Sequence, residues 1–344
     1  MCPKISLVYN DPLPSRYSGL GEGGAISSVL DEVKAVAQAL AGLGYQVTPL
    51  ALQPPLSQVR ASLAALDTEL VFNLFEGFDG RPETEAEVVR IMEELGLTFT
   101  GSPSSAIALA QNKAEAKQAL LAGGLSTPNY QVLLPETLPQ FRLGFPCIAK
   151  PLGEDASHGI SPSSVVNDLR ALERQVMALH QQYDCAVLVE QFLDGREFNA
   201  TVVGADRVQV FPPSEIIYTL TPGLPRILTY SAKWETEAEY YRGTRVKCPA
   251  DVDAALRVEI ADLASGAFQA LGCRGYARVD MRQNAAGRLM VLEVNSNPDI
   301  SPDAGASLQA RAAGLTYTEF IQMIVSLAGV NRQSDVDNQG RIAL

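Results

Sequence analysis

Three side chains near the C-terminal end of the chain, those of Asp280, Glu293 and Asn295, offer the clearest chemistry in the sequence. Residues 276–281 and 289–294 read as two strands joined by a tight turn, so antiparallel pairing can bring the two carboxylates within a few ångströms. Asn295 points to the same side as Glu293, because side chains alternate along a strand. All three offer the hard oxygen donors that Mg²⁺ prefers. The alternative is a pair of ordinary turn acids, but Glu293 lies inside an apolar strand where an unpaired carboxylate is costly. The pattern therefore predicts a magnesium site.

Arg278 lies two residues before Asp280, on the same face of the predicted strand. A guanidinium beside a metal site suits the stabilisation of negative charge that develops during phosphoryl or acyl transfer. We therefore expect Arg278 to act in such a transfer.

Two lysines could contact phosphate groups. Lys150 ends the apolar run 145–149, and a lysine is rarely buried without a partner. A phosphate contact and a purely structural role remain open for it. Lys113 lies on a helix predicted over residues 104–123, where a solvated surface charge is the default. The glycine-containing loop 152–161 follows Lys150, and its backbone amides could fold over a polyphosphate, although it matches neither standard phosphate-binding motif.

The segment VLVEQFLDGREF (187–198) could bind a nucleoside. Its apolar strand leads to Glu190, then to the apolar pair Phe192 and Leu193, and then to Glu197. Such a linker can stack on a purine while Glu197 accepts hydrogen bonds from ribose hydroxyls. The alternative, given equal weight, is a hairpin that turns at residues 194–195 between two core strands.

The elements that would position these side chains form an α/β chain. Strands are predicted at residues 5–9, 46–52 and 70–74, with helices at 28–43 and 83–95 between and after them, which indicates a parallel sheet covered by helices. The remaining elements are listed here: a helix at 166–182, strands at 186–192, 197–203, 276–281 and 289–294, and helices at 252–271 and 317–328. We expect domains at 1–101, 102–187 and 188–330, followed by a polar, flexible tail at 331–344.

The composition limits the classes of function. The net charge of −12 over 344 residues disfavours nucleic acid and anionic membranes as partners. No segment approaches the roughly 18 apolar residues of a membrane helix. The five cysteines are widely spaced, as expected for free thiols in a reducing cytoplasm. With only two histidines and no G-x-S-x-G motif, a histidine-rich metal site or a serine hydrolase is disfavoured.

Taken in order, these segments resemble the D-alanine–D-alanine ligase family of ATP-grasp enzymes. The matching segments are GLTFTGS (96–102), QNK (111–113), FPCIAKP (145–151), ASHGI (156–160), VLVEQFLDGREF (187–198), SAKW (231–234), GCRGYARVD (272–280) and LEVNSNP (292–298). The resemblance covers roughly residues 70 to 327. It implies an ATP-grasp fold of three domains with ATP between the central and C-terminal ones, and a cytoplasmic homodimer.

The resemblance also implies roles for individual residues. The implied ATP contacts are Lys113, Lys150, Ser157, Glu190, Phe192, Leu193, Glu197, Lys233 and Leu292. Asp280, Glu293 and Asn295 would hold Mg²⁺, with Mn²⁺ as a possible substitute. Lys233 would approach the γ-phosphate, and Arg278 would steady the tetrahedral intermediate. The implied reaction activates a carboxylate as an acyl phosphate, which an amine then attacks; it needs charge neutralisation and positioning, not a protein nucleophile.

The sequence departs from the family pattern where the amino-acid substrates bind. A Glu–Ser–Tyr group that seats the first substrate in D-alanine enzymes is replaced by Ala25, Ala156 and Trp234, with Glu22 as the nearest acid to the first position.

Three further departures introduce acids. A family histidine becomes Glu76, a family glycine becomes Asp299, and Asp303 stands in the segment that receives the acceptor's carboxylate. Acids in place of carboxylate-binding groups repel a carboxylate and favour an amine or another cation. We therefore take Glu22, Glu76, Trp234, Asp299 and Asp303 as substrate-site candidates.

Three hypotheses follow for the function. The first is a ligase of small carboxylate and amine substrates, such as amino acids or short peptides, whose acceptor is not D-alanine. The second is an authentic D-alanine–D-alanine ligase. The third, from another class, is a nucleotide-binding regulatory protein without turnover.

Overall fold

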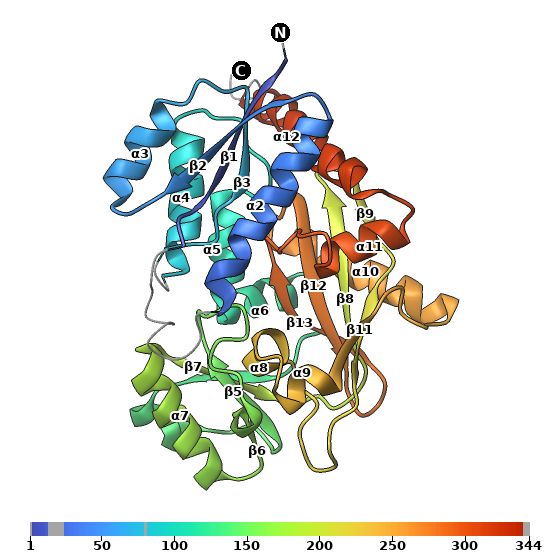
Figure 1. Cartoon of the computed structure of the whole chain (residues 1–344). Helices are drawn as coiled ribbons and strands as arrows, with labels where there is room; N and C mark the ends of the chain where they lie inside the picture. Colours follow the sequence, from blue (N-terminus) through green and yellow to red (C-terminus); the bar gives the residue numbers. More distant parts are fainter. Residues whose placement is uncertain (1, 13–23, 79–80, 340–344) are drawn as a thin grey trace, which may run out of the picture.

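In the part of the chain that the structure describes, the strands form three sheets that follow one another along the sequence (Figure 1). The computed structural model describes residues 2–12, 24–78 and 81–339, with side chains omitted for the helical residues 24–28 and 329–339. The mixed α/β architecture agrees with the prediction. Within the described residues, none of the helices is both long and apolar enough to cross a membrane.

The first sheet is parallel, with strand order β2–β1–β3, as the alternation of strands and helices predicted. Its elements are β1 (Lys4–Asn10), α2 (Gly24–Gly42), β2 (Gln46–Leu52), α3 (Leu56–Ala64), β3 (Leu70–Leu74) and α4 (Glu83–Glu94). All five residues of β3 are buried, as is typical of a parallel strand covered on both faces.

The second sheet is antiparallel, with strand order β4–β7–β5–β6. The elements of this region are α5 (Ser104–Gln111), α6 (Lys113–Ala122), β4 (Tyr130–Leu133), β5 (Cys147–Pro151), β6 (Val165–Val166), α7 (Leu169–Tyr183) and β7 (Val187–Gln191), with short 3₁₀ turns at Pro135–Gln140 and Pro162–Ser164. Helix α7 begins after Asp168, whose side chain accepts a hydrogen bond from the amide of Ala171. Leu172, Val176 and Leu179 recur at helical spacing and join the core of this sheet.

The third sheet is antiparallel and carries the order β11–β10–β8–β12–β13, with β9 paired to β8. Its elements are β8 (Glu197–Gly204), β9 (Val208–Val210), β10 (Ser214–Tyr218), α8 (Tyr230–Trp234), α9 (Glu239–Gly243), β11 (Thr244–Lys247), α10 (Ala254–Ala270), β12 (Gly275–Gln283) and β13 (Leu289–Asn295). Ile260, Ala264 and Ala267 of α10 pack into the core of this sheet.

The C-terminal helices return to the first sheet. They are α11 (Gly305–Ala312) and α12 (Tyr317–Gln339), and α12 lies beside α2 (Figure 1). Phe320 of α12 belongs to the same buried cluster as Val36 of α2, Ile5 of β1 and Tyr276 of β12. Segments from the two halves of the chain therefore share one core.

The single helix predicted over residues 104–123 is wrong, because the chain breaks at Asn112. The Asn112 backbone is extended, and its side chain accepts hydrogen bonds from the amides of Ala114 and Glu115. This N-cap starts α6 at Lys113 and separates it from α5.

The hairpin alternative at residues 194–195 is also wrong. Strand β7 lies in the second sheet and β8 in the third, so the linker between them crosses from one sheet to the other. The amide of Gly195 donates to the carbonyl of Gln283 in β12, 3.1 Å away. A Cβ on Gly195 would lie 2.3 Å from that oxygen, so the crossing needs glycine.

Three helix boundaries differ from the predicted ones by three residues or more, and one of them is the start of α2, which lies at Gly24 rather than at residue 28. The helix predicted at 166–182 begins at Leu169, because Val166 pairs with Cys147 as part of β6. Helix α12 continues to Gln339, so most of the segment predicted as a tail from residue 331 has helical backbone.

Candidate active site

A cavity of about 950 Å³ lies where the three sheets meet, and residues of all three regions line it. Every predicted site residue that the structure describes lines this cavity. They are Glu76, Lys113, Lys150, Ser157, Glu190, Phe192, Leu193, Glu197, Lys233, Trp234, Arg278, Asp280, Leu292, Glu293, Asn295, Asp299 and Asp303. Glu22 lies outside the described residues.

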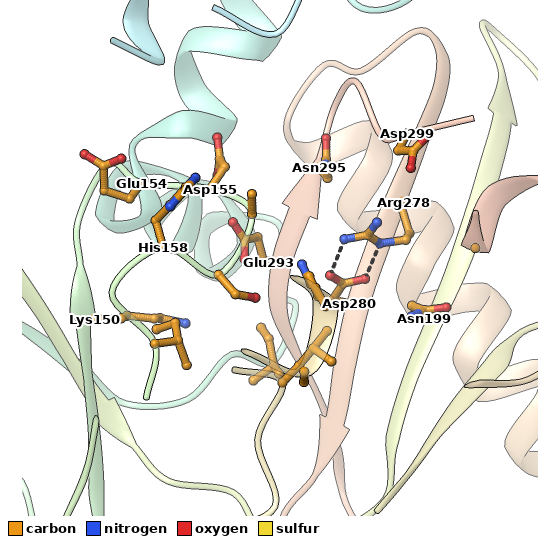
Figure 2. Close-up of a pocket in the computed structure, with 18 of the residues that line it drawn as sticks. Lys150, Glu154, Asp155, His158, Asn199, Arg278, Asp280, Glu293, Asn295 and Asp299 are labelled. Atoms are coloured by element: carbon orange, nitrogen blue, oxygen red, sulfur yellow. Dashed lines mark hydrogen bonds and ion pairs between the residues drawn. The ribbon is translucent and has the colours of Figure 1, made fainter. Parts of the chain in front are cut away.

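The predicted metal ligands project from two paired strands. Asp280 of β12 is directly opposite Glu293 of β13, and Arg278 is opposite Asn295. Arg278 binds the Asp280 carboxylate through two hydrogen bonds of 2.8 and 2.9 Å (Figure 2). Figure 2 shows Asn295 and Asp299 farther along the same side of the cavity. The arrangement brings oxygen donors from both strands to one place.

Glu293 is held in its charged form. Burial alone would raise the pKa of its carboxyl group, but Lys113 and Lys150 outweigh burial and lower the pKa to about 2. The Lys113 ammonium lies 3.3 Å from Glu293. A charged carboxylate, a second carboxylate opposite it and an amide are a donor set that fits Mg²⁺ when nucleotide oxygens complete the shell. Among the described residues, no group of three or more His, Cys, Asp or Glu side chains is arranged to hold a metal by itself.

Glu190 joins two lysines beneath the cavity. Its carboxylate lies 2.6 Å from the Lys150 ammonium and 2.8 Å from that of Lys117, which also donates to Thr127. Glu190 is 2% exposed and Lys117 is 1% exposed. Burial by itself raises the pKa of Glu190, but the two lysines lower it overall, so the carboxylate stays charged. Both of its oxygens face lysines, and its position suits holding Lys150 in place.

Lys113 is buried, and the surface charge expected by default for a lysine on that helix is wrong. Its ammonium donates to the carbonyl oxygen of Glu154 at 2.5 Å and lies 3.4 Å from Asp155. Burial disfavours the charged form, yet the surrounding carboxylates, led by Glu293, raise the pKa of Lys113 above its usual value. The Asn112 cap therefore places a permanent cation at the cavity wall.

The loop after β5 turns sharply at the cavity. Ala156 and Ser157 have left-handed backbones, with φ of 51° and 64°. Gly159 also has a positive φ, and a Cβ there would lie 2.8 Å from Pro151 and from Tyr183. Figure 2 shows Asp155 and His158 of this loop at the cavity. Successive turned residues of this kind present backbone amides in a concave arrangement that suits anions.

One side of the cavity is acidic. Glu32 of α2 is 4% exposed, and its carboxyl group accepts a hydrogen bond of 2.8 Å from the amide of Ile300. Burial, followed by the charges of Glu76 and Asp299, raises the pKa of Glu32 well above its usual value. Desolvation and the charges of Asp299 and Asp155 likewise raise the pKa of Glu76 to about 8. These carboxyl groups repel one another in the protein as it stands.

Helix α8 carries Lys233 and Trp234 to the cavity. Thr229 caps the helix by accepting a hydrogen bond from the amide of Ala232. Burial and the nearby Arg278 charge lower the pKa of Lys233. Trp234 is the single tryptophan of the chain.

The residues that line or support the site and that sequence reasoning missed include Glu32, Lys117, Arg282, Asp155 and Glu85. Lys117 lies four residues after Lys113, and Arg282 two residues after Asp280, so helical and strand periodicity place each on a functional face. No sequence pattern indicates that Glu32 is buried. From residue type alone one expects Leu30 to be buried and Glu32 to be exposed, but Leu30 is 47% exposed and Glu32 is buried.

A cavity lined by Lys150 of one antiparallel sheet, Lys113 of α6 and the paired carboxylates Asp280 and Glu293 of another antiparallel sheet has the arrangement of an ATP-grasp protein. The likeness to solved structures agrees with this fold. A D-alanine–D-alanine ligase from Bacillus anthracis superposes with a TM-score of 0.75 at 19% sequence identity, covering 97% of this chain and all of the other.

Sequence comparison gives the family. The family described as D-ala D-ala ligase C-terminus matches residues 122–326. A protein of Bordetella petrii named D-alanine–D-alanine ligase is 33% identical over 81% of each chain, and an uncharacterized protein of Sinorhizobium fredii is 32% identical over 75% of this chain and 74% of its own length. The chain belongs to the D-alanine–D-alanine ligase family, whose chemistry is ATP-dependent ligation of a carboxylate to an amine.

Proposed function

We propose that this protein is an ATP- and magnesium-dependent ligase that forms an amide bond through an acyl phosphate, and that its acceptor is an amine other than D-alanine. One observation carries the proposal: the same cavity holds cationic groups along one side and acids along another, of which Glu32 is buried and Glu76, Asp299 and Asp303 are exposed. Arg278 lies between Asp280, to which its Nε donates at 2.8 Å, and Asp299 (Figure 2).

The cationic side suits a nucleoside triphosphate. Lys113, Lys150 and Lys233 would contact phosphate oxygens, and the turned backbone at Ser157 would add amide donors. Asp280, Glu293 and Asn295 would hold Mg²⁺, which would neutralise charge on the phosphate oxygens.

The nucleoside would lie along the linker between the second and third sheets. Phe192, Leu193 and Leu292 would line the base, and Glu197 would accept hydrogen bonds from ribose hydroxyls. Glu190 supports this region by holding Lys150, rather than by offering a free acceptor to the base.

The proposed reaction has two steps. A carboxylate oxygen of one substrate attacks the γ-phosphorus, which breaks the bond to ADP and forms an acyl phosphate. The amine nitrogen of the other substrate then attacks the acyl carbon, phosphate leaves with the oxygen that joined it, and the nitrogen loses a proton. The Arg278 guanidinium is placed to stabilise the oxyanion of the second step.

The acidic side determines the proposed acceptor. Besides burial, the charges of Glu76 and Asp299 raise the pKa of Glu32, and those of Asp299 and Asp155 raise the pKa of Glu76, so another carboxylate brought beside them would add to the repulsion. An ammonium group would relieve it. Asp303 also lines this cavity, close to Asp299 in the chain. An acceptor with a positively charged group and no carboxylate next to its reacting amine fits this side best.

A second candidate is an authentic D-alanine–D-alanine ligase. The 33% identity with the Bordetella petrii protein of that name favours it. It requires a way to seat D-alanine's carboxylate beside the acids.

A substrate panel with phosphate release as readout tests the proposal. Purified protein with ATP and Mg²⁺ is given pairs of carboxylates and amines, including D-alanine alone and matched acceptors without a carboxylate, such as 1,5-diaminopentane and pentylamine, which differ by one charge. We expect release that needs both partners, favours the charged acceptor and does not occur with D-alanine alone. Release with D-alanine alone would make the second candidate right. Nucleotide binding without release from any pair would instead indicate a non-catalytic nucleotide-binding protein.

A further inference from the structure

Arg282 of β12 is a buried arginine whose partners all belong to the nucleotide side of the cavity. It is 3% exposed, and its Nη1 lies 3.0 Å from Oε2 of Glu197. Its Nε donates to the carbonyl oxygen of Gly195 at 3.2 Å. Burying an arginine without a partner has a high desolvation free energy, and these contacts offset it.

Two aromatic rings flank the same guanidinium. Its central carbon lies 5.5 Å from the ring centre of Phe192 and 5.8 Å from that of Tyr218. Both distances fall within the range of cation–π attraction. Arg282 thus fixes the linker between β7 and β8 at Phe192, Gly195 and Glu197.

Tyr218 acts on the same carboxylate from a neighbouring strand. Its hydroxyl donates to Oε2 of Glu197 at 2.8 Å. Both side-chain donors therefore act on one oxygen, and among the described residues none of the recorded side-chain bonds of Glu197 falls on Oε1. Burial raises the pKa of Glu197, while Arg282 and Tyr218 act to lower it.

We propose that Arg282 and Tyr218 are positioning residues that hold Glu197 by one oxygen, leaving the other to accept from a ribose hydroxyl, and so set a preference for ribonucleotides over deoxyribonucleotides. This inference rests on the proposed ATP site, and it assigns that site's sugar specificity to two residues that do not touch the reacting groups. A carboxylate fixed at one oxygen has little freedom at the other, so the hydroxyl bond forms without further ordering.

Nucleotide analogues lacking one hydroxyl test this proposal. Isothermal titration calorimetry with Mg²⁺ measures the dissociation constants of ATP, 2′-deoxy-ATP and 3′-deoxy-ATP. A hydrogen bond to a charged group predicts that the wild-type protein binds ATP roughly 10-fold or more tightly than at least one deoxy analogue. In Arg282→Met and Tyr218→Phe, the ratio of the deoxy analogue's dissociation constant to that of ATP should fall toward one, mainly because ATP binds more weakly.

Arg226→Met is the matched control. Arg226 binds Asp194 in the same linker, with Nε 2.9 Å from the carboxylate, but does not contact Glu197. It should leave the ATP-to-deoxy-ATP ratio unchanged. Tyr218→Phe removes a single oxygen, so it carries the test if Arg282→Met does not fold.

Two results would overturn the inference. One is a wild-type protein without preference between ATP and both analogues. The other is a Tyr218→Phe variant that weakens all three nucleotides equally, which would mean a purely structural role. Calorimetry measures binding and needs no turnover, so it is independent of the substrate panel. If no substrate pair releases phosphate but the wild-type protein still binds ATP more tightly than a deoxy analogue, and the variants lose that preference, the ligase proposal is overturned and this inference stands.

Discussion

Glu293 is the side chain on which the cations of the cavity converge. Lys113 lies 3.3 Å from it, and the charges of Lys150 and Arg278 also act on it. A half-buried carboxylate that stays charged at all ordinary pH values is available to a metal or a phosphate-binding lysine without a proton having to leave first. The neighbouring acids Glu76 and Glu85 behave in the opposite way, with pKa values raised to about 8.

Glu293→Gln should abolish turnover while the fold survives. The amide keeps the shape of the side chain but loses the negative charge that would bind Mg²⁺, which is worth several kcal/mol, or on the order of 100-fold or more in kcat. Phosphate release measures the loss, and thermal unfolding checks the fold. Glu215→Gln is the control, because Glu215 is a buried carboxylate of the same sheet that pairs with Arg196 outside the cavity. Near-normal turnover of Glu293→Gln would make the metal assignment wrong.

The titration of the Glu85 carboxyl group should lower the free energy of unfolding as the pH rises. Burial, then the charge of Asp155, raises its pKa from 4.5 to about 8, so between these values the folded protein binds more protons than the unfolded chain. Its stabilising contribution is therefore complete below about pH 4.5 and is lost as pH rises through 8. Glu85→Gln cannot lose a proton, so its stability relative to the wild-type protein should increase between pH 5 and 8.5. Urea unfolding at both pH values measures this, and an unchanged difference would contradict it.

At the scale of elements, local patterns predicted the strands better than the connections between them. Strands β2 and β3 have the predicted bounds, because apolar runs ended by polar or glycine residues define them locally. The break at Asn112 was missed because most of residues 104–123 are good helix formers, and one capping side chain decided the outcome. The sheet to which β8 belongs could not be predicted, because its partner strand β12 lies far along the chain.

The cap at Asn112 links local structure to the site. Asn112→Ala should lower the free energy of unfolding by about 1 kcal/mol and raise the KM for ATP, because α6 begins at Lys113. Asp253→Ala removes the matching cap of α10, far from Lys113 in the chain, and should cost a similar free energy with an unchanged KM. Equal KM values for the two variants would show that the cap does not position Lys113. Urea unfolding and steady-state kinetics give both quantities.

At the scale of the whole molecule, the acidic side of the cavity depends on packing between distant segments. Glu32 comes from α2, Glu76 follows β3, and Asp299 follows β13. The shared core of α2, α12 and β12 brings these segments together. Sequence motifs predicted the fold and identified the proposed ATP-contacting residues, because these residues lie in contiguous, recognisable segments. They could not predict Glu32, whose burial is set by which face of α2 meets Ile300.

The proposed function places two substrates and a nucleotide in one cavity, which residues from all three regions of the fold line. The second sheet supplies Lys150, the third supplies the paired carboxylates, and the first region supplies acids. Arg278, which Figure 2 shows between Asp280 and Asp299, would then lie between the proposed nucleotide side and the proposed substrate side. This arrangement matches a reaction in which a carboxylate is first phosphorylated and then attacked.

Oxygen transfer from carboxylate to phosphate tests that reaction most directly. Once the panel identifies a substrate pair, the carboxylate is labelled with ¹⁸O and the released phosphate is analysed by mass spectrometry. Attack on the γ-phosphorus followed by displacement predicts one ¹⁸O atom in each phosphate, dependent on the amine. Unlabelled phosphate would mean that water, not the carboxylate, attacks ATP, and would contradict the acyl-phosphate mechanism.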